Sequence, residues 1–298
     1  MKISVLCFDL SSNAFGRAWL LAKALSRVYD VEIIGTSRKG GIWAPMAHSK
    51  IPVKEFIWER YPKFSKIKKK FLDAIDGDLI LASKLMPTSF GIGLQKKYSS
   101  GKPLIVDIDD WELGFFYHSG FWGAAGRFLN FSNPNGLPYV WRMESLAGNA
   151  DATSVSNRFL QKKFGGILLP HCRDTTVLDP LKFNSDKIKE KMGFKNKKIV
   201  MFLGTLRPHK GVDDLLAALK IIDNPDLKLA IIGAENHHEF LEKVEKSIRH
   251  RVVVLPKMPF EKLPEFLSAA DIVAIPQRQT SDSVGQIPAR LFDAMSMA

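Results

Sequence analysis

KIVMFLGTLRPHKG, residues 198–211, places a buried strand, a turn and two cations within one short segment. Residues 199–203 are an apolar run of strand length, and Gly204 follows as the start of a turn. Arg207 and Lys210 stand three residues apart, directly before a helical pattern. In a parallel α/β sheet such a loop lies at the carboxyl edge, where backbone N–H groups and cations can bind an anion. The stretch predicts either an anion site or an ordinary solvated loop between strand and helix.

The same alternation of strand and helix continues on both sides of this stretch. After it, the pattern predicts strands at 199–203, 229–232, 252–255 and 272–275, and helices at 212–222, 238–249, 263–269 and 288–297. Before it, the pattern predicts strands at 3–8, 31–34, 79–82, 104–106, 152–155 and 167–169, and helices at 15–28, 60–72, 88–98, 137–148 and 157–164. The break after Pro170 predicts a first domain at 1–170 and a second at 171–298. We expect two doubly wound, Rossmann-like α/β domains facing across a cleft.

Composition and charge indicate a globular protein with an excess of basic residues. The 298 residues are 46% apolar and 25% charged, as in a globular protein with an ample core. The net charge is +12, and residues 1–170 carry 23 Lys and Arg against 14 Asp and Glu. This excess favours acidic partners such as an anionic membrane or a phosphorylated substrate. Cys7 and Cys172 lack metal-ligand spacing, and no apolar run has the length of a membrane span, so we expect a cytoplasmic protein.

Acidic residues follow the predicted strand at 104–106, in the sequence Asp107-Ile108-Asp109-Asp110-Trp111. Three carboxylates at the carboxyl end of a strand lie where active-site loops belong. They can hold a divalent cation, line a substrate cleft, cap the next helix or pair with arginine. The aromatic and glycine-rich segment 112–135 follows and contains His118. It is interpreted either as a loop over a cleft or as a buried connection, and His118 as either catalytic or structural.

Residues 60–72, RYPKFSKIKKKFL, form a basic amphipathic pattern. Tyr61, Phe64, Ile67 and Phe71 recur at helical spacing, with lysines on the flanks. Such a helix can lie on an anionic bilayer. The alternative is a surface helix whose apolar stripe packs on the sheet.

Five motifs of the second half occur in the order found in a known family. They are GTLRPHKGVD at 204–213, LAIIG at 229–233, VVVLP at 252–256, SAADIVAIP at 268–276 and GQIPARLFDAM at 285–295. Their succession resembles the retaining GT-B glycosyltransferases of the family 4 type. In the first half the resemblance is limited to the opening strand, loop and helix. Relatives continue beyond the last motif, so the resemblance implies a chain truncated at its C-terminus, with an incomplete second domain.

The resemblance implies roles for particular residues. Arg207 and Lys210 match the cationic pair that holds the diphosphate of a nucleotide sugar, and no metal ion or other cofactor is implied. Asp293 stands where a Glu usually pairs with the ribose, and Asp282 is the nearest counterpart of the acid beside the donor sugar. Asp109 matches the His-Asp pair that family members often carry in the first domain, and His118 can replace the missing imidazole, so Asp109, His118 and Asp282 are the catalytic candidates. Three glycines complete the donor-binding set: Gly16, Gly233 and Gly285.

The resemblance therefore implies a hexosyltransferase that uses a UDP- or GDP-sugar. We expect a saccharide or lipid-linked acceptor in surface polysaccharide or glycolipid assembly, with the protein peripheral on the inner face of the membrane. A GT-B-fold nucleotide-sugar epimerase or hydrolase is the second enzyme class, distinguished by turnover without acceptor. A non-catalytic GT-B scaffold that binds partners is the third interpretation. Nucleic acid is not an expected partner, because the basic and aromatic residues form no motif for binding it.

Overall fold

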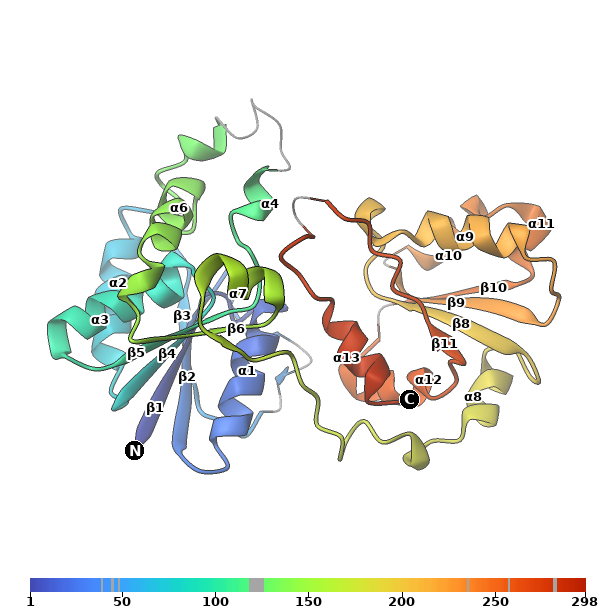
Figure 1. Ribbon diagram of the computed structural model, residues 1–298, viewed down its shortest axis with the longest axis horizontal. Helices are drawn as coiled ribbons and strands as arrows, with labels where there is room; N and C mark the ends of the chain where they lie inside the picture. Colours follow the sequence, from blue (N-terminus) through green and yellow to red (C-terminus); the bar gives the residue numbers. More distant parts are fainter. Residues whose placement is uncertain are drawn as a thin grey trace. The chain divides into compact units, whose positions relative to one another are not determined.

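The chain forms two compact units, which the computed structural model describes at residues 1–38, 40–43, 46–47, 49–117, 126–234, 236–256, 258–280 and 283–298 (Figure 1). The first unit consists of Met1–His171 together with Val284–Ile287. The second consists of Cys172–Ser283 and Pro288–Ala298. The sequence-based division assigned all of 171–298 to one domain, whereas the short segment Val284–Ile287 belongs with the first unit.

A seven-stranded parallel sheet forms the centre of the first unit, in the order β3-β2-β1-β4-β5-β6-β7. Its strands are β1 (Lys2–Cys7), β2 (Asp30–Ser37), β3 (Val53–Ile57), β4 (Leu79–Ser83), β5 (Leu104–Ile108), β6 (Ala152–Val155) and β7 (Ile167–Leu168). The sequence prediction missed β3. This strand lies at the edge of the sheet and has no fully buried residue, so its sequence VKEFI lacks the continuous apolar run of a central strand.

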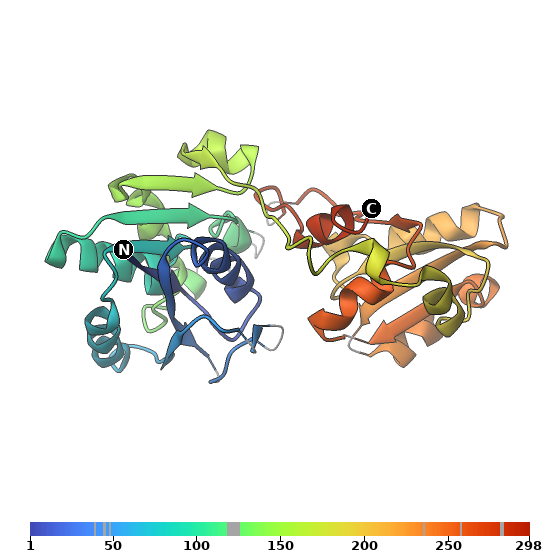
Figure 2. The same cartoon turned by 90° about the horizontal axis from the view of Figure 1, so that it is seen from below.

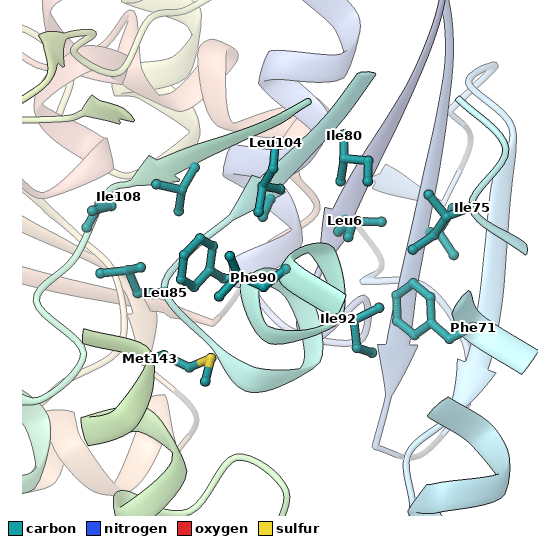
Figure 3. Packing of buried hydrophobic residues seen from close by; sticks show 14 of the residues in the cluster. Leu6, Phe71, Ile75, Ile80, Leu85, Phe90, Ile92, Leu104, Ile108 and Met143 are labelled. Atoms are coloured by element: carbon teal, nitrogen blue, oxygen red, sulfur yellow. The ribbon is translucent and has the colours of Figure 1, made fainter. Parts of the chain in front are cut away.

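Helices cover both faces of this sheet, as a doubly wound fold requires. They are α1 (Ala14–Leu25), α2 (Phe64–Ala74), α3 (Ile92–Ser100), α4 (Gly114–Tyr117), α6 (Leu137–Ser145) and α7 (Arg158–Phe164). Phe15, Ala18 and Ala22 of α1 pack on one face with Val5 of β1. On the other face, Figure 3 shows Phe71 of α2 and Ile92 of α3 beside Leu6, Ile80 and Leu104. Alternate residues of β1 thus serve two separate cores.

The predicted helices at 60–72 and 88–98 begin later than expected. Helix α2 starts at Phe64, and its apolar stripe of Phe64, Ile67 and Phe71 packs into the core. The surface-helix interpretation of this apolar stripe is therefore confirmed. Between β4 and α3 the chain first makes a π-helical turn, Pro87–Gly91, whose proline stands at the start because it needs no N–H donor there.

The second unit has a four-stranded parallel sheet in the order β10-β9-β8-β11. Its strands are β8 (Lys198–Leu203), β9 (Leu227–Ala234), β10 (Val252–Pro256) and β11 (Ile272–Val273). The helices are α8 (Ser185–Lys191), α9 (Val212–Ile221), α10 (His237–Lys243), α11 (Lys246–Arg249), α12 (Leu263–Leu267) and α13 (Ala289–Met295). Residues of α9 and α11 pack on one face of the sheet and residues of α8 and α12 on the other (Figures 1 and 2).

The single helix predicted at 238–249 is wrong. The backbone is extended at Val244 and Glu245, which separates α10 from α11. Val244 is buried against the sheet together with Ile248, so packing in the core outweighs the helical preference of the flanking charged residues. Helix α8 was not predicted, because its sequence SDKIKEK contains one apolar residue, Ile188.

Candidate functional site

The ends of β8 and β9 approach each other closely because both carry glycine. The N–H of Gly204 donates to the carbonyl of Ile232 at 2.7 Å. A Cβ on Gly233 would lie 2.9–3.1 Å from the backbone of Gly204, and Gly233 has a φ of +109°. Any other residue at 233 would separate the two turns. The two loops that follow these strands therefore share one edge of the sheet.

Arg207 and Lys210 project from the loop after β8, for which the sequence predicts either an anion site or an ordinary solvated loop. The segment Pro208–Lys210 is a 3₁₀ turn, and Gly211 caps α9 in the left-handed conformation with a φ of +69°. A Cβ on Gly211 would lie 2.1 Å from the carbonyl oxygen of Pro276. The loop is thus packed against the chain that leaves β11, which holds both cations at the carboxyl edge of the sheet.

A third cation, Arg290 of α13, joins Arg207 and Lys210 at this edge. Burial, repulsion from Arg290 and repulsion from Arg207 together lower the pKa of Lys210 to about 8. Burial also lowers the pKa of Arg290. Within the described ranges, none of the three side chains makes an ion pair with a carboxylate. Asp293 is the acid whose charge acts on Arg290, and it is bound by Arg173, so the three cations keep an excess of positive charge that suits a polyanion.

Asp293 lies on the same helix as Arg290 but is engaged elsewhere. Its buried carboxylate forms a charge-assisted hydrogen bond with Nε of Arg173. The same guanidinium donates to the carbonyls of Cys172 at 2.8 Å and Ala289 at 2.9 Å. Arg173 therefore fixes the start of α13. The lone pairs of Asp293 that Arg173 does not use can accept hydrogen bonds from another group.

A cavity of about 240 Å³ opens beside the loop after β8. It is lined by Thr205, Leu206, Asn236, Glu239, Phe240 and Lys243. These residues come from the loops after β8 and β9 and from α10, so the cavity lies at the same sheet edge as the cations.

Asp109 lies in the first unit, within a cluster centred on Lys84. The ammonium of Lys84 is 2.8 Å from Oδ1 of Asp109 and 3.0 Å from Oε1 of Glu112, and it also contacts Asp110. Lys84 follows β4, while the carboxylates follow β5, so the cluster occupies the carboxyl edge of the first sheet. Lys84 has a φ of +71°, which is unusual for a side chain with a Cβ. The sequence allowed a divalent cation among these acids as one interpretation. In the structure the ammonium of Lys84 lies among them.

Within the cluster the pKa values of Asp109 and Glu112 are shifted in opposite directions. Burial raises the pKa of Asp109, but the charges of Lys84, His171 and Arg17 outweigh it, so this pKa lies below its ordinary value. For Glu112, burial and repulsion from Asp110 and Asp109 outweigh Lys84 and raise the pKa to about 7. Glu112 therefore carries a proton for part of the time at neutral pH.

Gly16 lies in the first turn of α1, next to a buried ion pair. Its Cβ position is 3.3 Å from the ring of Trp43. The neighbouring Arg17 binds Asp107 through Nε at 2.9 Å and Nη2 at 2.8 Å. Nη2 also donates to the carbonyl of Leu169 at 2.8 Å. This pair fastens α1 to β5 and to the chain after β7.

Gly285 belongs to the short segment that lies with the first unit. Its carbonyl accepts a hydrogen bond from Nδ2 of Asn157 at 3.0 Å. A Cβ at this position would lie 2.5 Å from Cβ of Trp111, so only glycine fits. The adjacent Gln286 hydrogen-bonds Asp110. Gly285 is therefore close to the acidic cluster that contains Asp109, whereas Arg207, Lys210 and Gly233 gather in the second unit.

The other two predicted residues, His118 and Asp282, lie outside the described residues. Sequence reasoning missed Lys84, Glu112 and Arg290. The sequence contained a signal for Lys84: it is a cation directly after a buried strand, and Arg207 was singled out because it comes shortly after such a strand. For Arg290 the signal was a cation inside the otherwise mainly apolar motif GQIPARLFDAM.

Comparison with known proteins finds a family match in the later part of the chain. Residues 184–297 match the family described as "Glycosyl transferases group 1". A GDP-mannose-dependent alpha-(1-6)-phosphatidylinositol monomannoside mannosyltransferase of Mycolicibacterium smegmatis is 27% identical over 148 residues, which are 46% of this chain and 39% of that protein. An uncharacterized glycosyltransferase of Methanocaldococcus jannaschii is 32% identical over 27% of this chain and 22% of that protein. The matched segments thus span well under half of these relatives.

Solved structures share the fold over the full chain. Anabaena HepE in complex with UDP-glucose has a TM-score of 0.70 at 17% identity, covering 100% of this chain and 78% of that one. WaaG, a glycosyltransferase involved in lipopolysaccharide biosynthesis, has a TM-score of 0.65 at 14% identity, covering 100% and 79%. At these identities the likeness shows the fold alone, and it confirms the predicted GT-B architecture.

Proposed function

Residues 184–297 belong to the glycosyl transferases group 1 family, and on this premise we propose that the protein transfers a hexose from a nucleotide sugar to an acceptor. The donor is a UDP- or GDP-sugar, and the anomeric configuration is retained. The acceptor is a saccharide or a lipid-linked molecule of surface polysaccharide or glycolipid assembly. HepE, which has the same fold, is known with UDP-glucose, while two curated relatives use GDP-mannose and phosphatidylinositol mannosides, so both bases enter the experiment.

The observation that carries this proposal is the unpaired cation set at the carboxyl edge of β8. When a nucleotide sugar reacts, the leaving diphosphate gains negative charge as the glycosidic bond breaks. Fixed cations such as Arg207 and Lys210 stabilise that charge in the transition state without reorganising. Because protein cations supply this stabilisation, the proposal requires no metal ion. The neighbouring cavity of about 240 Å³ gives room for part of the nucleotide.

The acids have separate roles in the proposal. Asp293, held by Arg173, accepts hydrogen bonds from the ribose. Asp109, held ionised by Lys84, accepts hydrogen bonds from sugar hydroxyls on the acceptor side. His118 and Asp282 keep the catalytic roles that the family resemblance implies.

The test is calorimetric titration of the purified chain with UDP, GDP, ADP and CMP, each with and without magnesium. We expect one nucleotide to bind, with an affinity that magnesium does not change. Arg207→Ala and Lys210→Ala should each weaken binding about 10- to 100-fold, the range for loss of one charge-assisted hydrogen bond.

Arg278→Gln is the matched control, because this arginine also projects from the carboxyl side of the second unit but is paired with Asp214 at 2.6 Å. It should bind the nucleotide as the wild type does. If no nucleotide binds to the wild-type chain, the transferase proposal fails and the scaffold interpretation replaces it. Hydrolysis or epimerisation of the bound nucleotide sugar without acceptor would favour the second enzyme class.

For the acceptor, we propose that the first unit binds the inner face of an anionic membrane. Among the described helices, none is both long and apolar enough to cross a bilayer. The outer face of α2 and the residue before it instead expose four lysines that form no ion pair within the described part of the chain: Lys63, Lys66, Lys69 and Lys70. Arg60, before α2, donates to Ser132 at 2.8 Å and so holds the segment that exposes Phe128 and Phe131. Exposed aromatics beside unpaired lysines match the interface of an anionic bilayer.

A further inference from the structure

We propose that Arg290 is a third phosphate-binding residue, which makes the site selective for nucleoside diphosphates over monophosphates. This inference rests on the proposed function, because it extends the donor site formed by Arg207 and Lys210. Arg290 lies on α13, more than seventy residues after the cationic loop in sequence, so the fold alone brings it to this site.

The position of Arg290 is set by Gly204, at the end of β8. A Cβ built on Gly204 would lie 2.2 Å from Nη2 and 2.3 Å from Cζ of Arg290. The guanidinium therefore rests directly on the glycine, in space that any side chain at 204 would fill. Its Cζ is also 5.8 Å from the ring centroid of Phe202 on β8. These contacts hold the planar group at the sheet edge where the loop with Arg207 begins.

Apart from the ring of Phe202 and the attraction of the Asp293 charge, the structure gives Arg290 no internal partner in the described ranges. No hydrogen bond or ion pair joins its guanidinium to another residue in the described ranges. The carboxylate on the same helix, Asp293, is bound by Arg173 instead. A guanidinium offers five N–H donors in a fixed plane. Its donors are therefore available to a ligand.

The pKa of Lys210 indicates that the charge of Arg290 lies close to the ammonium of this lysine. After burial, repulsion from Arg290 is the largest influence that lowers the pKa of Lys210, ahead of repulsion from Arg207. A folded protein keeps three like charges together without a counter-ion only at a cost in stability. Binding of an anion between them removes that repulsion.

The number of charges indicates the ligand class. Arg207, Lys210 and Arg290 supply three positive charges, which match the roughly three negative charges that a nucleoside diphosphate carries once it has left the sugar better than the two of a monophosphate. A guanidinium can bind two phosphate oxygens at once, whereas the ammonium of Lys210 acts as a point charge.

The test compares Arg290→Met with the wild type, because methionine keeps contact with Phe202 but carries no charge. The probes are UDP, UMP and uridine, or the guanosine series if GDP is the nucleotide that binds. We expect affinity for the diphosphate to fall about 10- to 100-fold, with a smaller loss for the monophosphate and none for the nucleoside. Arg290→Lys should recover part of the loss, and Arg278→Gln should have no effect.

A second measurement needs no nucleotide. The rate at which an amine-specific reagent modifies Lys210, followed by mass spectrometry from pH 7 to 10, reports the titration of this lysine. In Arg290→Met the titration should move to higher pH, because the largest repulsion is gone.

Equal loss of affinity for uridine and UDP would show a merely structural role and overturn the inference, as would unchanged UDP affinity. An unshifted Lys210 titration would also overturn it, because Arg290 would then not face Lys210. Failure of the wild type to bind any nucleotide would instead reject the proposed function.

Discussion

Glu112 and Lys84 show how single buried charges are balanced in the first unit. One ammonium serves three carboxylates, those of Asp109, Asp110 and Glu112, so the cluster is short of positive charge. Burial adds to the cost of ionising all three acids. Protonation relieves this cost: the pKa of Asp110 is raised, and that of Glu112 is raised to about 7 from an ordinary value of 4.5.

Replacement of Glu112 by glutamine should therefore stabilise the protein at alkaline pH. Because the folded-state pKa of Glu112 lies above its unfolded value, the folded state binds more protons between the two values, and the wild type loses stability as the pH rises from about 4.5 to about 7. Glu112→Gln cannot ionise and avoids this loss. We expect its advantage in unfolding free energy over the wild type to grow by roughly 1–3 kcal/mol from pH 5 to pH 8.

Urea unfolding of both proteins at pH 5 and pH 8 measures this difference. Glu239→Gln, which changes an exposed glutamate on α10, is the control and should show a much smaller pH effect of its own. A Glu112→Gln variant that is less stable than the wild type at pH 8 would mean that Lys84 requires all three carboxylates in ionised form.

The same residues mark the limit of prediction from sequence. Arg207 and Lys210 lie in one short loop next to the strand that carries them, so local pattern was enough to single them out. Arg290 reaches that loop only through the packing of α13 on Gly204, and Lys84 meets Asp109 only through the pairing of β4 with β5. Contacts of this kind depend on the register of the sheet and on side-chain packing, neither of which local periodicity contains.

At the scale of elements, buried strands were predictable and exposed ones were not. The central strands β1, β4 and β8 have nearly continuous apolar sequences because both faces of a parallel sheet are covered. The edge strand β3 and the divided pair α10 and α11 depend on tertiary packing instead. The sequence showed that glycine stands at strand ends, as at Gly204 and Gly233. It did not show which residues these glycines contact.

Gly233 and Gly101 form a matched pair that tests how closely β8 and β9 must approach. Both have positive φ, +109° and +71°, but a Cβ on Gly101 would meet nothing within 4 Å, whereas one on Gly233 would press on the backbone of Gly204. Gly101→Ala should cost about 1–2 kcal/mol from the backbone conformation alone. Gly233→Ala should cost more, roughly 2–4 kcal/mol, because strain and a steric conflict with backbone add together.

Thermal unfolding of the two variants gives the comparison, and nucleotide titration of Gly233→Ala adds a functional measurement. We expect weaker nucleotide binding in Gly233→Ala, since the turn at Gly204 carries the cationic loop, and unchanged binding in Gly101→Ala. Equal destabilisation by the two substitutions would mean that the ends of β8 and β9 can separate freely.

At the scale of the whole molecule, charge is divided unequally along the chain. Residues 1–170 have 23 basic against 14 acidic side chains, whereas residues 171–298 have 20 against 17. In the second half, many exposed lysines pair with acids, as Lys220 does with Glu245 at 2.9 Å and Lys191 with Glu265 at 3.0 Å. The lysines of α2 have no such pairs in the described part of the chain, so unpaired positive charge is concentrated there on the first unit.

Binding to lipid vesicles should therefore require α2 and anionic lipid together. We expect the protein to sediment with vesicles that contain phosphatidylglycerol, but not with pure phosphatidylcholine vesicles, and to be released by high salt as the charges are screened. In the variant Lys63→Glu, Lys66→Glu and Lys70→Glu, affinity should fall at least 10- to 100-fold, since each lysine near an anionic surface contributes about 1 kcal/mol.

The control reverses three charges on the second unit instead, with Lys187→Glu, Lys246→Glu and Lys262→Glu. It makes the same change in net charge and should leave most of the vesicle binding intact. Equal losses in the two variants would attribute the attraction to net charge alone, and salt-resistant binding to uncharged vesicles would assign it to the exposed aromatics Phe128 and Phe131 instead of the lysines.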